Sequence, residues 1–187
     1  LYKRGLSFTV VDTRMQPPGL AILRHEMPEV AVFAGEYPAE LVASASALIV
    51  SPGIAMDTRI VTQALDAGIE VLGDIDLFMR EAAAPVVGIT GSNAKSTVTE
   101  LLGQMARYAQ LNVGVGGNLG TPALDLLALE RDLYVLELSS FQLERAGRLD
   151  LAVAAVLNIS ADHLDRHGSM PGYLGAKHRI FRGCKKA

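Results

Sequence analysis

The residues best placed to do chemistry lie in a segment that reads Val-Val-Gly-Ile-Thr-Gly-Ser-Asn-Ala-Lys-Ser-Thr, from Val86 to Thr97. An apolar run leads into a short polar loop, and Lys-Ser-Thr then opens a predicted helix. In a phosphate-binding loop, backbone N–H groups and a helix N-terminus bind phosphate oxygens, the lysine neutralises charge, and the next hydroxyl binds Mg²⁺. The predicted phosphate-binding residues are Gly91, Ser92, Asn93, Ala94, Lys95, Ser96 and Thr97.

The loop departs from the general phosphate-loop pattern at two places. Ala94 stands where a glycine usually precedes the lysine, and Gly91 lies three residues before Ala94, where the strict pattern has five. Alanine fits a loop that wraps a phosphate if its φ is negative, whereas a positive φ strains it. The alternative interpretation is an ordinary strand–turn–helix with a lysine in solvent.

A second candidate is Glu137, which lies inside the apolar run 134–138. A buried acid costs free energy unless it is paired or bound to metal. In phosphate-loop enzymes an acid at the end of a neighbouring strand holds Mg²⁺, and Glu137 suits that role. Ser139, Ser140 and Gln142 follow it and suit substrate hydrogen bonds. The alternative is a glutamate at a strand end in water.

A third polar segment follows the apolar run 153–159. Open α/β sheets bind ligands at the carboxyl ends of their strands. Asp162, His163 and Asp165 could ligate a metal there, and such hard donors favour Mg²⁺. The alternative is a loop histidine that binds nothing. Lys177 has no role that its spacing suggests, and we expect it in solvent.

Two segments in the first half of the chain also follow apolar runs. Small residues and free N–H groups at such strand ends suit a nucleotide or its diphosphate. The alternative is two ordinary turns. The segments are Asp12, Thr13 and Arg14, and Ser51, Pro52 and Gly53.

These residues must be positioned by strands and helices that alternate along the chain, a pattern typical of an α/β fold with parallel sheets. The most plausible domain boundary is Ala82-Ala83-Ala84-Pro85, which predicts domains of residues 1–84 and 85–187. The predicted strands are 7–12, 30–33, 47–50, 70–72, 86–90, 113–115, 134–138 and 153–159. The predicted helices are 20–27, 58–67, 74–82, 98–109, 122–129 and 173–181.

Composition excludes several classes of protein. The chain has 187 residues, is 50% hydrophobic and carries a net charge of −3, which argues against disorder and against a basic nucleic-acid-binding surface. Its one cysteine excludes a disulfide framework. No apolar run approaches the roughly 18 residues of a membrane span. Residues 1–5 look like the end of a helix with its glycine cap, so we expect a fragment of a longer protein.

The motifs Gly91–Thr97, Gly116-Gly117-Asn118, Glu137–Gln142 and Asp162-His163, taken together and in this order, resemble those of the Mur ligases. These are ATP-dependent, amide-forming ligases of peptidoglycan precursor synthesis. The N-terminal motifs resemble the members that add D-glutamate to UDP-N-acetylmuramoyl-L-alanine. The resemblance implies a Rossmann-like N-terminal domain and a P-loop-type α/β ATPase domain, both incomplete.

The resemblance also assigns roles to single residues. Lys95 and its loop would bind ATP, and Lys177 would be carbamylated. The implied ligands of two Mg²⁺ ions are Ser96, Glu137, His163 and the modified Lys177. The implied catalytic residues are Lys95, Glu137, His163 and Lys177. The implied substrate-binding residues are Asp12, Thr13, Arg14, Ser51, Pro52, Gly53, Asn118, Ser139 and Gln142.

The implied partners are UDP-N-acetylmuramoyl-L-alanine, ATP and D-glutamate, with no nucleic acid and no membrane. The D-glutamate site would lie in a further domain, so we expect this chain alone to be an inactive, cytoplasmic monomer. Two alternatives stay open from the residues themselves. One is another phosphate-loop kinase or NTPase, and the other is a nucleotide-binding module without catalysis.

Overall fold

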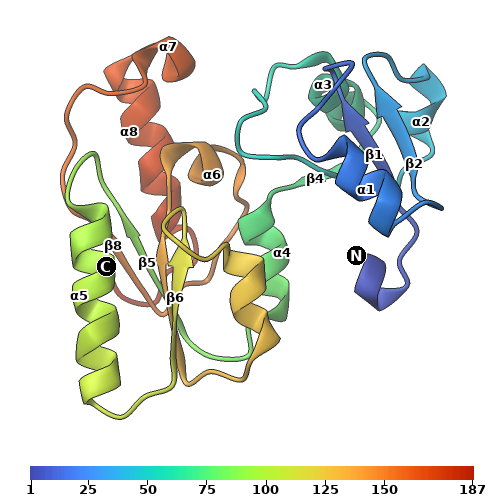
Figure 1. The fold of residues 1–187 in the computed structure, drawn as a ribbon. Coiled ribbons are helices and arrows are strands. Elements are labelled where there is room, and N and C mark those ends of the chain that lie inside the picture. Colours follow the sequence, from blue (N-terminus) through green and yellow to red (C-terminus); the bar gives the residue numbers. More distant parts are fainter. The chain divides into compact units, whose positions relative to one another are not determined.

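The computed structural model covers residues 1–187 and describes the backbone throughout, together with every side chain except those of Lys3 and Ala39. It divides into two compact units, Leu1–Ala45 and Ser46–Ala187 (Figure 1). Both units are built from alternating strands and helices, and every strand pair within them is parallel. The predicted α/β class with parallel sheets is therefore confirmed.

The first unit is a small βαβ arrangement. Its two strands pair in parallel, with Thr9 opposite Ala31 and Asp12 opposite Ala34. Gly5 takes the left-handed conformation that a glycine cap requires, with φ 65°, after one 3₁₀ turn. The elements are η1 (Tyr2–Arg4), β1 (Thr9–Asp12), α1 (Leu20–Glu26), β2 (Ala31–Ala34) and α2 (Ala39–Ala43).

The second unit contains a two-stranded sheet, β3 with β4, and a four-stranded sheet in the order β6-β7-β5-β8. Its first elements are β3 (Ala47–Ile49), α3 (Arg59–Asp66), β4 (Glu70–Leu72), α4 (Asp74–Glu81), β5 (Val86–Thr90), α5 (Lys95–Tyr108) and β6 (Val113–Gly117). Its later elements are η2 (Ala123–Ala128), β7 (Leu133–Glu137), α6 (Ser140–Arg145), β8 (Val153–Val156), α7 (Leu164–His167), α8 (Met170–His178) and η3 (Arg179–Phe181).

Both faces of the four-stranded sheet are covered, as a parallel sheet requires. On one face Val135 of β7 and Ile89 of β5 pack against α5. On the other, Tyr134 and Leu136 of β7 pack with Phe78 of α4 and with η2. Figure 1 shows α5 on one side of these strands and α4 on the other. This period of two places Glu137, two residues after Val135, on the face that α5 covers.

The structure corrects some predicted boundaries. The helix predicted from residue 98 begins at Lys95, because the Val98 N–H already donates to the Ala94 carbonyl. The helix predicted over 122–129 is a 3₁₀ helix, and the strand predicted to reach residue 159 ends at Val156. The helix predicted over 173–181 begins earlier, at Met170, and finishes as a 3₁₀ turn. The short helices α2, α6 and α7 were not predicted.

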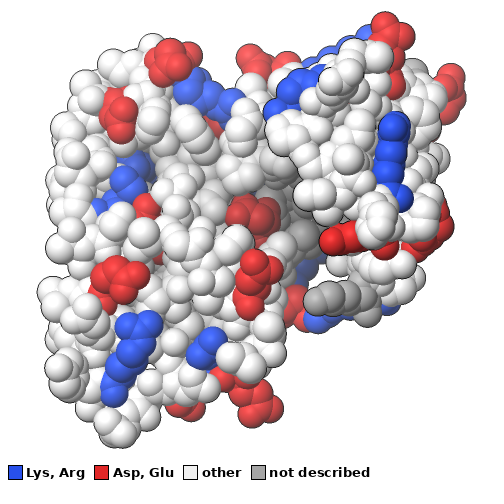
Figure 2. Space-filling view, in the orientation of Figure 1, with Lys and Arg blue, Asp and Glu red and all other residues white. Residues whose placement is uncertain are grey.

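The predicted domain boundary between residues 84 and 85 stays a prediction. Helix α4 precedes that boundary, yet Ile75 and Phe78 on it are buried in the core of the four-stranded sheet. Among the described residues, no helix combines the length and apolar character needed to cross a bilayer. Figure 2 shows acidic and basic side chains scattered among one another over the visible face.

We expect the close approach of β6 to its following loop to make Gly116 intolerant of a side chain. A Cβ at Gly116 would overlap the carbonyl oxygen of Thr121, whereas one at Gly175 in α8 would meet open space. Gly116→Ala should lower the free energy of unfolding by about 1–3 kcal/mol, because the backbone must shift. Gly175→Ala should raise it by about 0.5–1 kcal/mol through helix propensity. Urea denaturation of both variants measures this, and equal effects would contradict the packing described.

Candidate functional site

The predicted site residues gather at one edge of the four-stranded sheet. Ile89 of β5 and Gly117 of β6 both pair with Glu137, and Thr90 pairs with Val156 of β8. Because the strands are parallel, all four carboxyl ends meet at this edge. The loops that follow them carry the phosphate loop, Asn118, Ser139 and Asn158.

The phosphate loop is held in shape by the segment after β8. The Asn93 N–H donates to Oδ1 of Asn158 at 2.9 Å, and Nδ2 of Asn158 donates to the Asn93 carbonyl at 3.1 Å. The Ser92 N–H donates to the Asn158 carbonyl, and the Ser92 hydroxyl accepts from the Ser160 N–H at 2.9 Å. One loop therefore fixes the other before any ligand is bound.

Helix α5 opens directly after this loop with no side-chain cap. The N–H groups of its first turn, from Lys95 to Thr97, have no acceptor within the helix, which makes the turn a ready anion site. The Lys95 ammonium folds back and donates to the Ser92 carbonyl at 3.1 Å. These features confirm the predicted strand–loop–helix arrangement of a phosphate loop.

Ala94 stands where a phosphate loop usually has a glycine, so the sign of its φ decides whether the loop is strained. Its φ is 63° and its ψ is 7°, in the left-handed region. An L-residue with a Cβ is strained there by roughly 1–2 kcal/mol. The loop therefore keeps its shape at the cost of backbone strain at Ala94.

Glu137 ends β7 and is 2% exposed. Its two carboxylate oxygens accept from the Ser96 hydroxyl and from Nδ2 of Asn118, each at 2.7 Å. Both donors are neutral, so the negative charge of Glu137 has no direct counterion in these contacts. A hydroxyl and a carboxylate on the same side of the loop are oxygen donors of the kind that Mg²⁺ prefers.

The residues at this edge do not form a complete Mg²⁺ site by themselves, but they fit a Mg²⁺ ion that also binds phosphate. Among the described side chains, no group of three or more His, Cys, Asp or Glu could hold a metal ion. Mg²⁺ commonly takes one or two carboxylates and completes its shell with substrate phosphates and water. Ser96 and Glu137, beside a phosphate loop, match that mode of binding.

The sequence predicts that Lys177 lies in solvent, and this prediction is wrong. Lys177 is 2% exposed and lies beneath the phosphate loop. Its ammonium donates to the Gly91 carbonyl at 2.8 Å and to the Thr90 hydroxyl at 3.3 Å, over the ring of Tyr173. Burial, and then the nearby charge of Lys95, lower the pKa of Lys177 to about 8.

The predicted metal ligand His163 lies at the surface. It is half exposed, with Nε2 3.4 Å from a carboxylate oxygen of Asp162 and its ring 4.9 Å from that of Phe141. Its part in a second metal site stays a prediction, as does that of Asp165.

Ser139 and Gln142 form a capping box at the start of α6. The Ser139 hydroxyl accepts from the Gln142 N–H at 3.2 Å, and Oε1 of Gln142 accepts from the Ser139 N–H at 3.0 Å. The Gln142 amide also donates to Asp74 at 2.9 Å, and the Gln142 side chain is buried. The Ser140 hydroxyl lies 3.0 Å from Nε2 of His167. The substrate contacts predicted for these residues stay predictions.

The predicted nucleotide motifs nearer the N-terminus have different partners. In the first unit, Arg14 donates to both carboxylate oxygens of Asp12, and this hydrogen bonding holds the pKa of Asp12 at about 2. Thr13 beside them is exposed. In the second unit, the carbonyls of Ser51 and Pro52 accept from Arg145 at 2.6 and 2.8 Å.

Sequence reasoning missed three residues that shape the site. Asn158 lies inside the predicted strand 153–159, although an amide there can pair with a neighbouring loop. Asp74 lies at the start of the predicted helix 74–82. Arg145 carried no signal, since four of its five acceptors are carbonyls more than 90 residues away in the sequence.

A parallel sheet with a strand–loop–helix of this form, and an acid on the adjacent strand, is the arrangement of an α/β protein of the phosphate-loop class. Residues 89–187 match the Mur ligase middle domain, and residues 1–73 match the Mur ligase MurD-like N-terminal domain. The chain belongs to the Mur ligase family.

Individual relatives agree with this assignment. The chain is 60% identical over 186 residues to UDP-N-acetylmuramoylalanine--D-glutamate ligase of Pseudomonas aeruginosa, with 100% of this chain and 42% of that protein covered. The enzyme of the same name from Pseudomonas putida is 56% identical, with 100% and 41% covered. The chain thus spans about two fifths of the curated relatives it matches.

One solved structure shares the fold. It is UDP-N-acetylmuramate:L-alanyl-gamma-D-glutamyl-meso-diaminopimelate ligase from Neisseria meningitides, with a TM-score of 0.57 and 18% identity. The match covers 97% of this chain and 62% of that one.

We expect relief of the strain at Ala94 to stabilise the protein. Ala94→Gly should raise the free energy of unfolding by about 1 kcal/mol, since glycine adopts a positive φ freely and the gain exceeds its entropy cost. Ala109→Gly at the other end of α5, where φ is −78°, should lower it by about 0.5–1 kcal/mol. Thermal unfolding of the two variants measures both, and a loss at Ala94 would contradict the strain.

Proposed function

We propose that this chain is the UDP-substrate-binding and ATP-phosphate-binding part of an ATP-dependent ligase that joins D-glutamate to UDP-N-acetylmuramoyl-L-alanine in peptidoglycan precursor synthesis. The observation that carries the proposal is the 60% identity, over the whole chain, to a ligase named for that reaction. The site supports it, because Lys95, Ser96 and Glu137 lie together at one sheet edge.

The proposed reaction has two steps. A carboxylate oxygen of the L-alanyl group attacks the γ-phosphorus of ATP, the bond to the bridging oxygen breaks, and ADP leaves. The D-glutamate amine then attacks the acyl phosphate carbon and loses a proton. The tetrahedral intermediate collapses to the amide and inorganic phosphate. The first step brings two anions together, so it needs preorganised positive charge.

The chain supplies that charge from residues already in place. The Lys95 ammonium and the free N–H groups of the first turn of α5 would bind the β- and γ-phosphates. Ser96 and Glu137 would hold a Mg²⁺ ion, which neutralises phosphate charge when bound. His163 and a carbamylated Lys177 would hold a second ion.

The remaining substrate contacts are proposed for both units. Asp12, Thr13 and Arg14 would bind on the uracil side, and Ser51, Pro52 and Gly53 on the diphosphate side. Asn118, Ser139 and Gln142 would face the rest of the substrate. D-Glutamate would bind to a part of the protein outside this chain. The domains we propose are residues 1–84 for the UDP-substrate and 85–187 for ATP, in a cytoplasmic, monomeric enzyme.

The experiment that tests the function uses the complete gene product. Phosphate release from ATP is followed with UDP-N-acetylmuramoyl-L-alanine while D-glutamate, L-lysine or no amine is added. Release that requires D-glutamate supports the ligase. Release that ignores the amine supports a plain NTPase, and the substrate roles proposed above would then be withdrawn.

Lys95→Ala should lower the turnover of that enzyme by about 100-fold or more, because phosphate charge would go unneutralised in the transition state. Binding of UDP-N-acetylmuramoyl-L-alanine should be nearly unchanged, since Lys95 bonds only to the phosphate loop in this structure. Lys185→Ala, at an exposed position, is the control. Calorimetry and phosphate release give the two values, and equal loss of both would contradict the ATP role of Lys95.

The carbamylation proposed for Lys177 depends on its neutral amine. The amine nitrogen attacks the carbon of CO₂, an N–C bond forms, and a proton leaves, so the side chain changes from a cation to an anion. With a pKa of about 8, the neutral fraction rises steeply between pH 7 and pH 9.

We therefore expect the carbamate signal of Lys177 to grow over that pH range at constant dissolved CO₂. Carbon-13 NMR of the protein in labelled bicarbonate measures it, with Lys177→Arg to assign the signal. A signal that persists in Lys177→Arg, or one that falls as pH rises from 7 to 9, would contradict the prediction.

A further inference from the structure

Arg145 is a buried cation that neither the proposed chemistry nor the sequence motifs use. It closes helix α6 and is 5% exposed. Its guanidinium donates to carbonyl oxygens throughout, and no carboxylate is among its hydrogen-bond partners in the described residues. The acceptors are the carbonyls of Val50 at 3.2 Å, Ser51 at 2.6 Å, Pro52 at 2.8 Å, Ile54 at 2.7 Å and Phe141 at 3.2 Å.

Four of these five carbonyls belong to one loop, residues 50–54, which leaves β3. A guanidinium presents five N–H donors in a rigid planar fork, so it can hold several carbonyls in fixed directions. Desolvation on burial lowers the pKa of Arg145, yet the group stays charged. The loop is therefore wrapped around a cation that its own carbonyls solvate.

This wrapping determines where the N–H groups of the loop point. The peptide bonds here are trans, and a trans peptide directs its N–H opposite to its C=O. The N–H groups of Ser51, Gly53 and Ala55 follow carbonyls that face Arg145, so they point away from it. None of the three donates a hydrogen bond within the described part of the chain.

The outward side of the loop is also open. Ser51 and Gly53 are exposed, and a Cβ at Gly53 would meet no atom within 4 Å. Backbone N–H groups that a loop leaves unpaired and open to solvent can bind an anion. Arg166 supports the far end of the loop, since it donates to the Ile54 carbonyl at 2.9 Å while it pairs with Glu144 at 2.7 Å.

We propose that Arg145 is the positioning residue of the diphosphate subsite. It never touches the ligand. It holds the carbonyls of residues 50–54 inward, so that the N–H groups of Ser51, Gly53 and Ala55 face outward toward a nucleoside diphosphate, and its buried charge adds to their positive potential. The identity of the ligand rests on the proposed function, whereas the orientation of the loop rests on the hydrogen bonds alone.

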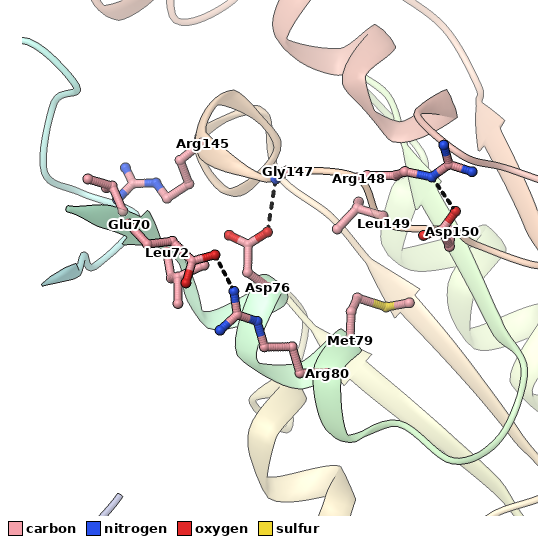
Figure 3. Close-up of a pocket in the computed structure, with 11 residues that line it drawn as sticks. Glu70, Leu72, Asp76, Met79, Arg80, Arg145, Gly147, Arg148, Leu149 and Asp150 are labelled. Atoms are coloured by element: carbon pink, nitrogen blue, oxygen red, sulfur yellow. Dashed lines mark hydrogen bonds and ion pairs between the residues drawn. The ribbon is translucent and has the colours of Figure 1, made fainter. Parts of the chain in front are cut away.

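The chain offers a matched control three residues further on. Arg148 shares a pocket wall with Arg145, but Figure 3 shows it directed over Asp150, with which it pairs at 2.7 Å in solvent. Arg145→Lys keeps the charge but cannot reach four carbonyls at once, and Arg148→Lys makes the same exchange where no loop depends on it.

The test combines NMR of the nitrogen-15-labelled chain with calorimetric titration of UDP. Arg145→Lys should move the amide resonances of Ser51, Gly53 and Ala55 and weaken UDP binding by about tenfold, because the donors lose their fixed direction. Arg148→Lys should change neither. Should Arg145→Lys unfold the chain, Arg166→Lys serves instead. It should shift the Ala55 amide and weaken UDP binding by about threefold, as it supports one end of the loop only.

An Arg145→Lys chain that keeps its loop resonances and binds UDP as Arg148→Lys does would overturn the proposal. If the unsubstituted chain binds no UDP, the proposed function fails at its UDP site. The amide shifts of residues 51–55 would still decide whether Arg145 positions the loop.

Discussion

The buried carboxylate of Glu137 is the group on which the arrangement of the sheet edge beside the phosphate loop depends. A carboxylate at 2% exposure must be satisfied by donors from its surroundings. The donors come from the Ser96 hydroxyl on α5 and the Asn118 amide after β6, so one side chain on β7 ties together α5 and the segment after β6. The pairing of Glu137 with Ile89 and Gly117 places it between the two neighbouring strands. Any shift of β7 by one residue would turn Glu137 to the other face and break both bonds.

Much of this arrangement could be predicted from the sequence, because local patterns carry it. The run from Val86 to Thr97 is contiguous, and its apolar and polar parts fold into a strand, a loop and a helix start as expected. The acid in β7 was recognisable because a charge inside an apolar run is rare. The sign of φ at Ala94 was not predictable, since it depends on how Asn158 and Ser160 hold the loop from another part of the chain.

The residues that the sequence did not reveal have partners far away along the chain. Lys177 looks like any helical lysine until the fold places it beneath Gly91, 86 residues earlier. Arg145 likewise meets a loop more than 90 residues away. Ser139 and Gln142 show a different problem, because their pattern is local but has two explanations. Their spacing fits a capping box as well as a substrate contact, and the structure uses it as a cap. When a local pattern has two physical explanations, the sequence alone does not show which one applies.

Three cations of the second unit share one feature that links the fold to its proposed ligands, whereas Arg80, Arg148 and Arg166 pair with carboxylates. Lys95, Lys177 and Arg145 all donate to backbone carbonyls near strand ends, and not to carboxylates. A cation paired with a carboxylate contributes little potential beyond the pair, whereas one solvated by carbonyl dipoles has no directly bonded counterion. Around Arg145, the carbonyls of Val50, Pro52 and Ile54 each precede an N–H that points the opposite way, whereas the N–H groups of Ser92 and Asn93 donate to Asn158. At the loop 50–54, the contacts that make burial of Arg145 tolerable therefore also present N–H donors to the outside. Nucleoside di- and triphosphates are polyanions of the kind that such loops suit, and the loops 50–54 and 91–97 are the ones that we propose for UDP and ATP.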